Sequence, residues 1–119
     1  MNISEIRAKE IYALADFQQI PSIGIEFAKD LMFLGFYNVR ELNGEIGSDL
    51  LDRYERMKGY KTDPCVEDQF RLAVDFATNK DFSKKWWDFT KERKEYRTQN
   101  GYPSDRPKLN WTEVLNVGK

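Results

Sequence analysis

Pro21 and Gly24, three residues apart in the stretch Ile20–Gly24, constrain this chain more than any other feature of its sequence. Proline fixes φ and cannot continue a helix that begins upstream. Glycine adopts backbone conformations that are closed to other residues. We therefore expect the chain to reverse sharply here and a new helix to begin directly after the reversal.

Apolar side chains at helical spacing predict a helix on each side of this reversal. Before it, Asn2 is a natural N-cap with Glu5 as its capping-box partner, and the apolar face consists of Ile3, Ile6, Ile11 and Leu14. This helix is expected to end near Ala15, with Asp16 capping a short further turn. After the reversal, a helix that ends at Gly35 is predicted by the stripe of Phe27, Leu31 and Leu34, with Ala28 beside it.

Start and stop signals predict three more helical segments. Asn38 is expected to cap a short segment over residues 39–42, and a helix should run from Ser48 or Asp49 to Gly59. Asp63 as N-cap, with a proline directly after it, begins a helix that we expect to lie across the core.

The C-terminal third has a different composition. We expect a helix over residues 84–97, and the glycine and prolines after it predict an irregular tail over residues 98–119. Because no segment alternates polar and apolar residues for long enough to be a strand, the prediction is an all-α protein. Its organisation would be one compact helical domain over residues 1–97 followed by the tail.

Length and composition narrow the function. A chain of 119 residues buries roughly 65% of its unfolded surface, which is enough for a core without disulfides or a structural metal. Cys65 is the one cysteine, and there is no histidine, the commonest metal ligand and acid–base group near neutral pH. We therefore expect a protein that is not an enzyme and has no obligatory cofactor, located in the cytoplasm and without a membrane segment.

Charge is divided unevenly along the chain. Residues 1–80 hold 10 Lys/Arg and 14 Asp/Glu, a net charge of −4, whereas residues 81–119 hold 9 and 6, a net charge of +3. The whole chain therefore lacks the basic character typical of nucleic-acid-binding domains. Any attraction to phosphate is expected to be local.

The pattern of Ile20–Gly24, followed by an alanine and a leucine, resembles the helix-hairpin-helix motif. That resemblance implies that hairpin backbone N–H groups, at the positive end of the second helix, hold a nucleic-acid phosphate. Gly59 lies in another predicted turn between two helices, 35 residues after Gly24. It predicts a degenerate second hairpin, with residues 39–42 as the connector.

Several longer blocks carry a wider resemblance: Ile20–Gly24, Arg53–Met57, Asp63–Val66, Phe70–Arg71, Ala73–Val74 and Trp86–Thr90. With these blocks, roughly residues 14–90 resemble the small bacterial pathogenicity-locus protein family. The resemblance implies a helical helix-hairpin-helix domain that is taken to bind DNA, although the biochemical role of the family is unsettled.

Two residues depart from the hairpin motif. Ser22 replaces its first glycine, which the backbone tolerates if φ is negative there. Glu26 stands where DNA-binding versions often carry lysine, and its repulsion of a phosphate at about 4 to 6 Å is worth on the order of 3 to 4 kcal/mol at an effective dielectric of about 20. Lys29 would offset this only if its side chain reaches back.

These observations define a first candidate site at the hairpin. We expect weak, salt-dependent and non-sequence-specific contact with DNA phosphates through Ser22, Ile23, Gly24, Ile25, Phe27 and Lys29. The resemblance also implies a monovalent cation beneath the turn, on the backbone carbonyls of Gln18, Ile20 and Ile23. The alternative is a purely structural corner between two core helices.

A second candidate is a basic and aromatic patch formed by Lys84, Lys85, Trp87, Lys91 and Lys94. Aromatic and basic residues interleaved in this way can stack bases, although such aromatic clusters more often cap a core. The run over residues 91–97 is expected to be a solvated helix face.

Other side chains are expected to be structural. Cys65 would lie at the second position of its helix, where free N–H groups favour a thiolate and nearby carboxylates oppose it, and we expect a buried structural thiol. The carboxylates expected on helix surfaces are Asp49, Asp52, Glu55, Glu67 and Asp68.

Two other functions compete with nucleic-acid binding. The first is a protein–protein interaction or self-association module, such as a homodimer, that uses Trp86 and Trp87. The second is thiol-based redox or transfer chemistry at Cys65, which would require an exposed sulfur of low pKa.

Overall fold

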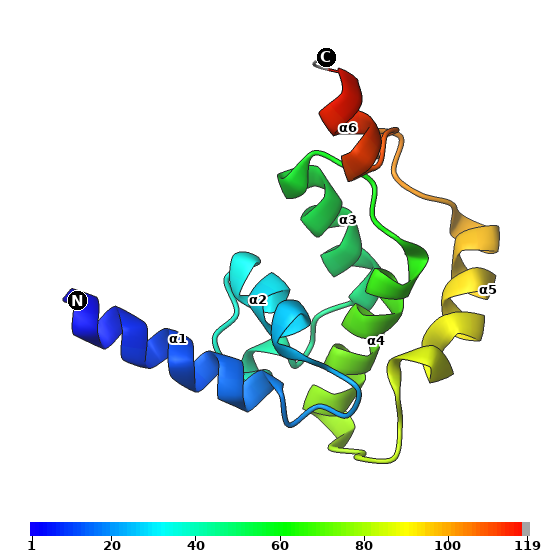
Figure 1. The fold of residues 1–119 in the computed structure, drawn as a ribbon. Helices are drawn as coiled ribbons and strands as arrows, with labels where there is room; N and C mark the ends of the chain where they lie inside the picture. Colours follow the sequence, from blue (N-terminus) through cyan, green and yellow to red (C-terminus); the bar gives the residue numbers. More distant parts are fainter. Residues whose placement is uncertain (118–119) are drawn as a thin grey trace.

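Helices make up almost all the regular structure of residues 1–117, the part of the chain that this computed structural model describes. In chain order the elements are α1 (Ile3–Phe17), α2 (Ile25–Phe33), the 3₁₀ helix η1 (Val39–Leu42), α3 (Gly47–Lys58), α4 (Pro64–Asn79), the 3₁₀ helix η2 (Trp86–Phe89), α5 (Thr90–Asn100) and α6 (Trp111–Val117) (Figure 1). These residues contain no strand beyond a one-residue bridge between Lys61 and Asn110, which confirms the all-α prediction.

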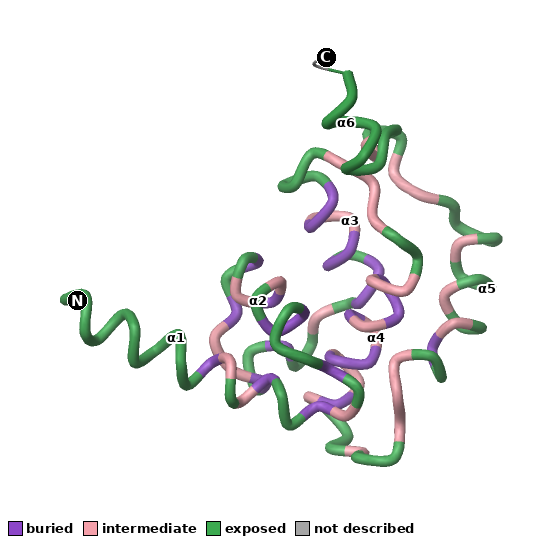
Figure 2. The backbone as a smooth tube through the Cα atoms, viewed as in Figure 1, coloured by how far each residue is buried: buried purple, intermediate pink, exposed green. Residues whose placement is uncertain are grey.

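The core forms around α4, as its strong start signal predicted. Its buried face carries Phe70, Leu72, Ala73 and Phe76. The helices α3 and α5 and the short η1 and η2 all pack against α4, and Figure 2 shows buried positions concentrated where α2, α3 and α4 meet. Phe27 from α2 meets Phe70 edge to face, with ring centroids 4.9 Å apart.

Local capping signals are confirmed at several helix ends. Asn2 Oδ1 accepts the N–H of Glu5 at 2.9 Å, and Asn38 Oδ1 accepts the N–H of Glu41 at 3.0 Å. Gly59 ends α3 in the left-handed conformation, with φ of 81°. These bonds join a side chain to backbone three residues away, so no distant contact is needed to predict them.

Two expected boundaries are wrong. Helix α1 runs through Phe17 instead of ending near Ala15, because Asp16 does not cap a new turn. Its Oδ2 instead accepts the N–H of Val39 at 2.7 Å and so ties α1 to η1. The last long helix begins at Thr90, not residue 84, because Asp88 Oδ2 accepts the N–H of Lys85 at 2.8 Å and closes a tight turn first.

Three carboxylates predicted on the surface are buried. Glu55 and Glu67 are 0% exposed and Asp68 is 1% exposed, whereas Asp49 is exposed as expected. Burying a charge is costly unless a partner compensates it. Each is paired with an arginine from residues 90–110, and we call this segment the C-terminal strap. The pairs are Asp68 with Arg93 at 2.8 Å, Glu67 with Arg97 at 2.9 Å and Glu55 with Arg106 at 2.7 Å.

The C-terminal strap is held mainly by these ion pairs. Helix α5 contains no buried residue, and Figure 2 shows it half-buried or exposed along its length. The prediction of a solvated face holds for Lys91 and Lys94 and is wrong for Arg93 and Arg97. The expected irregular tail also contains α6, and Leu109 O accepts the N–H of Lys61 at 2.8 Å.

Acid should destabilise the fold partly through Glu55. Burial alone would raise the pKa of this carboxyl, but hydrogen bonds from Arg106 and Thr62 outweigh burial and lower the pKa. Because the pKa is lower in the folded state, the stabilisation is present above the unfolded-state pKa of about 4.3 and is lost as pH falls through the folded-state pKa. Urea unfolding between pH 3 and 7 should show a shallower pH dependence for Glu55→Gln than for wild type, and identical slopes would contradict this.

Candidate nucleic-acid interface

The turn between α1 and α2 is fixed by two buried side chains. Ile20 and Ile23 are 1% and 6% exposed, and the N–H of Ile23 donates to Ile20 O at 3.2 Å. The predicted sharp reversal is therefore present. The Ile23 donor is already used inside the turn, which leaves the phosphate-binding role predicted for it without a free N–H.

The left-handed residue of the turn is Ser22, not Gly24. Ser22 has φ of 62°, so the condition under which serine is readily tolerated here, a negative φ, is not met. Gly24 has φ of −99° and ψ of −174°, an extended conformation open to any residue. The side chain of Ser22 has a role of its own in the fold, because its Oγ accepts the N–H of Trp86 at 3.0 Å.

The first turn of α2 presents unpaired donors. Gly24 is the N-cap and brings no side-chain cap, and the first backbone bond of the helix runs from Ala28 N–H to Gly24 O at 3.1 Å. Within residues 1–117, no acceptor receives the N–H groups of Gly24, Ile25, Glu26 and Phe27. A Cβ added to Gly24 would meet no atom within 4 Å, and Gly24, Ile25 and Glu26 are exposed, so solvent reaches the start of this helix.

The two charged side chains on this turn face each other. Lys29 Nζ lies 3.6 Å from Glu26 Oε1, with both side chains exposed. Lysine therefore does reach back toward the acidic residue that departs from the motif. An exposed pair contributes little to stability, but it brings the two charges together beside the free N–H groups.

The predicted cation site is only partly available. The carbonyl of Ile20 already accepts the N–H of Ile23. One of the three carbonyls predicted to hold the cation is therefore engaged within the turn. No cluster of His, Cys, Asp or Glu suited to a metal ion occurs among residues 1–117. A monovalent cation on Gln18, Ile20 and Ile23 stays a prediction.

The second predicted hairpin, between α3 and α4, uses the donors of Thr62 and Lys61 within the fold. Thr62 donates its N–H and its Oγ1–H to Glu55 Oε2 at 2.8 and 2.9 Å. Lys61 donates its N–H to the C-terminal strap at Leu109. Pro64 also removes one N–H from the start of α4, so this turn offers fewer free donors than the first turn of α2, a difference that the sequence spacing of the two turns did not reveal.

The aromatic half of the second patch lies against the hairpin. The Ser22–Trp86 bond joins η2 to the turn, which Figure 1 shows running toward the segment before α5. Trp86 is half-buried and packs edge to face on Trp87, with ring centroids 5.3 Å apart, while Trp87 is 54% exposed.

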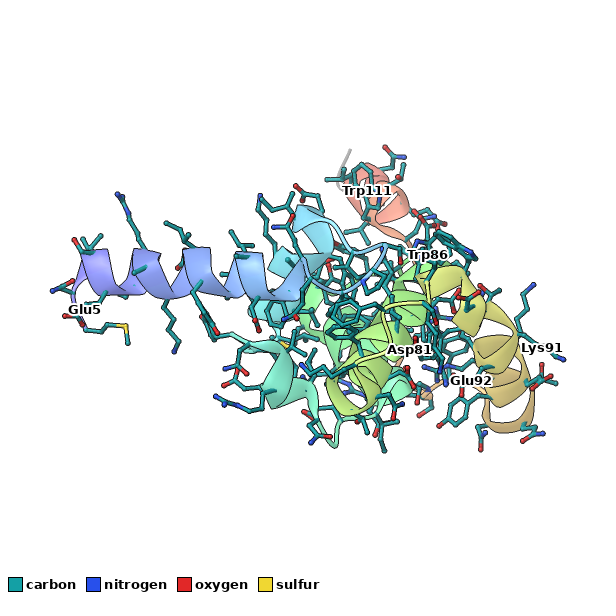
Figure 3. All side chains as sticks on the ribbon, turned by 90° about the horizontal axis from the view of Figure 1, so that it is seen from below. Glu5, Asp81, Trp86, Lys91, Glu92 and Trp111 are labelled. Atoms are coloured by element: carbon teal, nitrogen blue, oxygen red, sulfur yellow. The ribbon has the colours of Figure 1, made fainter. Side chains whose placement is uncertain are left out.

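The basic half of that patch is more dispersed. Lys84 Nζ contacts Asp75 Oδ2 at 3.4 Å, and Lys85 is half-buried. Lys91 and Lys94 are exposed on α5, and Figure 3 shows Lys91 on the outer side of that helix. The structure therefore brings Trp86, the neighbour of Trp87, to the hairpin but leaves the lysines spread over the segment before η2 and over α5.

Cys65 lies at the second residue of α4, as predicted, and is half-buried. Burial and the neighbouring carboxylates of Asp63 and Asp68 raise the pKa of its thiol. The thiol is therefore protonated near neutral pH, which disfavours thiol chemistry.

The fold is an all-α domain in which the first turn of α2 leaves its N–H groups without an acceptor among residues 1–117. Residues 10–95 match the family model Cdd1, described as Pathogenicity locus, and the chain belongs to this family. It is also 26% identical over 88 residues to the mitomycin resistance protein McrB of Streptomyces lavendulae, a match that covers 74% of this chain and 83% of that protein. No solved structure matches.

None of the helices in residues 1–117 has the length and apolar character needed to span a bilayer.

Proposed function

We propose that the first turn of α2 binds a backbone phosphate of DNA, and that the protein is a non-enzymatic, non-sequence-specific DNA-binding module. The observation that carries this proposal is the row of free N–H groups from Gly24 to Phe27 at an uncapped, open helix N-terminus. Such a terminus combines unpaired donors with the positive end of the helix dipole, and it favours an anion.

Neighbouring side chains favour nucleic acid over a free anion. Trp87 follows Trp86, which is bonded to Ser22 in the turn, and its exposed ring offers a base a surface for stacking. Lys29 partly compensates Glu26 at the same turn. With one hairpin available, few phosphates are engaged, so affinity should be weak, and each neutralised phosphate adds about 0.9 to the logarithmic salt slope on duplex DNA.

Replacing Gly24 by valine should weaken DNA binding about tenfold without unfolding the protein. The extended backbone of Gly24 accepts a side chain, and valine would cover the free N–H groups. The loss of the glycine N-cap should cost no more than about 1 kcal/mol of unfolding free energy. Fluorescence anisotropy of labelled duplex and single-stranded DNA at two salt concentrations measures the effect.

Thr112→Val, on the exposed helix α6, is the matched control and should bind like wild type. Undetectable binding of wild type at low salt, or equal binding by Gly24→Val, would reject the hairpin site. Trp87→Ala tests the alternative that the exposed tryptophan contacts a protein partner, because a stacking role predicts weaker DNA binding.

The name of the Streptomyces lavendulae relative makes mitomycin a necessary second probe. The drug alone is titrated while tryptophan fluorescence is followed. Quenching by mitomycin in a protein that does not bind DNA would replace the proposed nucleic-acid function with drug binding.

A further inference from the structure

The N-terminal half of α1 projects beyond the rest of the molecule with its apolar residues uncovered. Ile3, Ile11 and Tyr12 are 69%, 67% and 62% exposed, and Ile6 is 42% exposed. Figures 1 and 3 show this half of the helix extending away from the other helices, with Glu5 near its free end. The apolar face predicted for this helix is therefore uncovered at Ile3, Ile6 and Ile11.

This exposed face continues a face that is buried further along. On the helical wheel, Ile3, Ile6 and Leu14 share an arc with Ala13 and Phe17, and the last two are fully buried. A helical segment of about ten residues without tertiary packing is only marginally stable in water. The N-terminal half of α1 therefore has an apolar face that a packing partner would cover, and such a partner would stabilise the helix.

The charges of this segment are complementary to a second copy of itself. Residues 1–12 carry two acidic side chains, Glu5 and Glu10, and two basic ones, Arg7 and Lys9. Arg7 and Glu10 lie within the apolar arc. If two α1 helices run antiparallel about a two-fold axis between residues 8 and 9, Arg7 of each copy faces Glu10 of the other. The same register sets Ile6 opposite Ile11 and Ile3 opposite Leu14.

We propose that the occupant of this face is a second copy of the chain, packed through α1 as an antiparallel helix pair. A two-fold interface uses the same patch twice, and the reciprocal Arg7–Glu10 pairs satisfy that requirement. The uncovered apolar side chains in this register are Ile3, Ile6 and Ile11 of each copy, a small patch beside the roughly 1,200 to 2,000 Å² that standard specific interfaces bury. The dimer should therefore be weak and form in the micromolar range.

Sedimentation equilibrium from 1 to several hundred μM tests the pairing. Wild type should pass from monomer to dimer over about this range. Arg7→Glu and Glu10→Arg place like charges opposite each other and should each weaken self-association about tenfold. An equimolar mixture of the two variants should dimerise at least as well as wild type, because opposite charges then meet at both reciprocal positions.

The mixture distinguishes contact between copies from an effect within one helix. Each variant carries the same altered charges along its own helix whether it is alone or mixed, so only contact between copies can restore association. Lys91→Glu, an equal charge change on the exposed face of α5, should dimerise like wild type. A monomeric mass for wild type at every concentration, or no association in the mixture, would overturn the proposal. Gly24→Val should also dimerise normally, so failure of DNA binding and failure of dimerisation are independent results.

Discussion

Arg97→Ala should lower the free energy of unfolding by about 3 to 5 kcal/mol, the cost of leaving buried charge without its partner. Arg97 Nε donates to Glu67 Oε1 at 2.9 Å, and Nη2 donates to Asp52 Oδ1 at 2.9 Å. Nη2 also donates to Ser48 O at 3.2 Å. The variant would leave Glu67, which is 0% exposed, with Arg71 as its remaining basic contact.

Urea unfolding followed by circular dichroism measures the loss. Arg97→Lys should be intermediate, because lysine keeps the charge but not the planar fork that reaches two carboxylates. Lys94→Ala, on the exposed side of α5, is the matched control and should change the unfolding free energy by about 0.5 kcal/mol or less. A loss below about 1 kcal/mol for Arg97→Ala would show that Glu67 and Asp52 find water or another partner.

Gly47→Ala should be the most damaging alanine substitution among the glycines that the structure describes. A Cβ at Gly47 would lie 2.8 Å from Cα and 2.7 Å from Cγ of Arg71. The Cα belongs to the backbone of α4, so a rotamer change cannot relieve the clash, and α3 and α4 must separate. Overpacking of this kind typically costs 1 to 3 kcal/mol, and about 3 is expected here because backbone is involved.

Gly24→Ala provides the matched comparison for Gly47→Ala in the same thermal and urea unfolding measurements. Its Cβ would meet no atom within 4 Å, and its φ is negative. It should therefore change the unfolding free energy by less than about 1 kcal/mol. Equal losses for the two glycine variants would contradict the close approach of α3 and α4.

Local chemistry made most helix boundaries predictable. Asn2 and Asn38 cap helices through bonds to residues three positions away, and Gly59 ends one by its own backbone conformation. The helix after the Ile20–Gly24 turn also follows from the apolar spacing of its own residues. These features depend on neighbours in the chain, so the sequence contains the necessary information.

Long-range contacts decided what could not be predicted. Glu67 and Asp68 have the appearance of first-turn surface acids, because their partners lie 30 and 25 residues later at Arg97 and Arg93. One signal was available: Glu67 lies three residues before the buried Phe70 and so falls near the apolar face of α4.

The conformation of the hairpin was equally dependent on a distant residue. Both Ser22 and Gly24 could accommodate an unusual backbone conformation, and local sequence does not distinguish them. In the structure Ser22 is the left-handed residue, and its side chain is bonded to Trp86, 64 residues away, a contact that local sequence does not disclose. The free donors of α2 follow from Gly24 as a cap without a side chain, which the motif resemblance had already indicated.

The arginine attachments of the C-terminal strap make the last third of the chain part of one cooperative unit. The family match over residues 10–95 includes Glu55, Glu67 and Asp68 but stops before Arg97 and Arg106. A fragment cut to those limits would retain Arg93 and lose the counter-ion of Glu55 altogether. Any truncation meant to isolate the hairpin should therefore keep the chain through Arg106, or replace Glu55 by a neutral residue of similar volume.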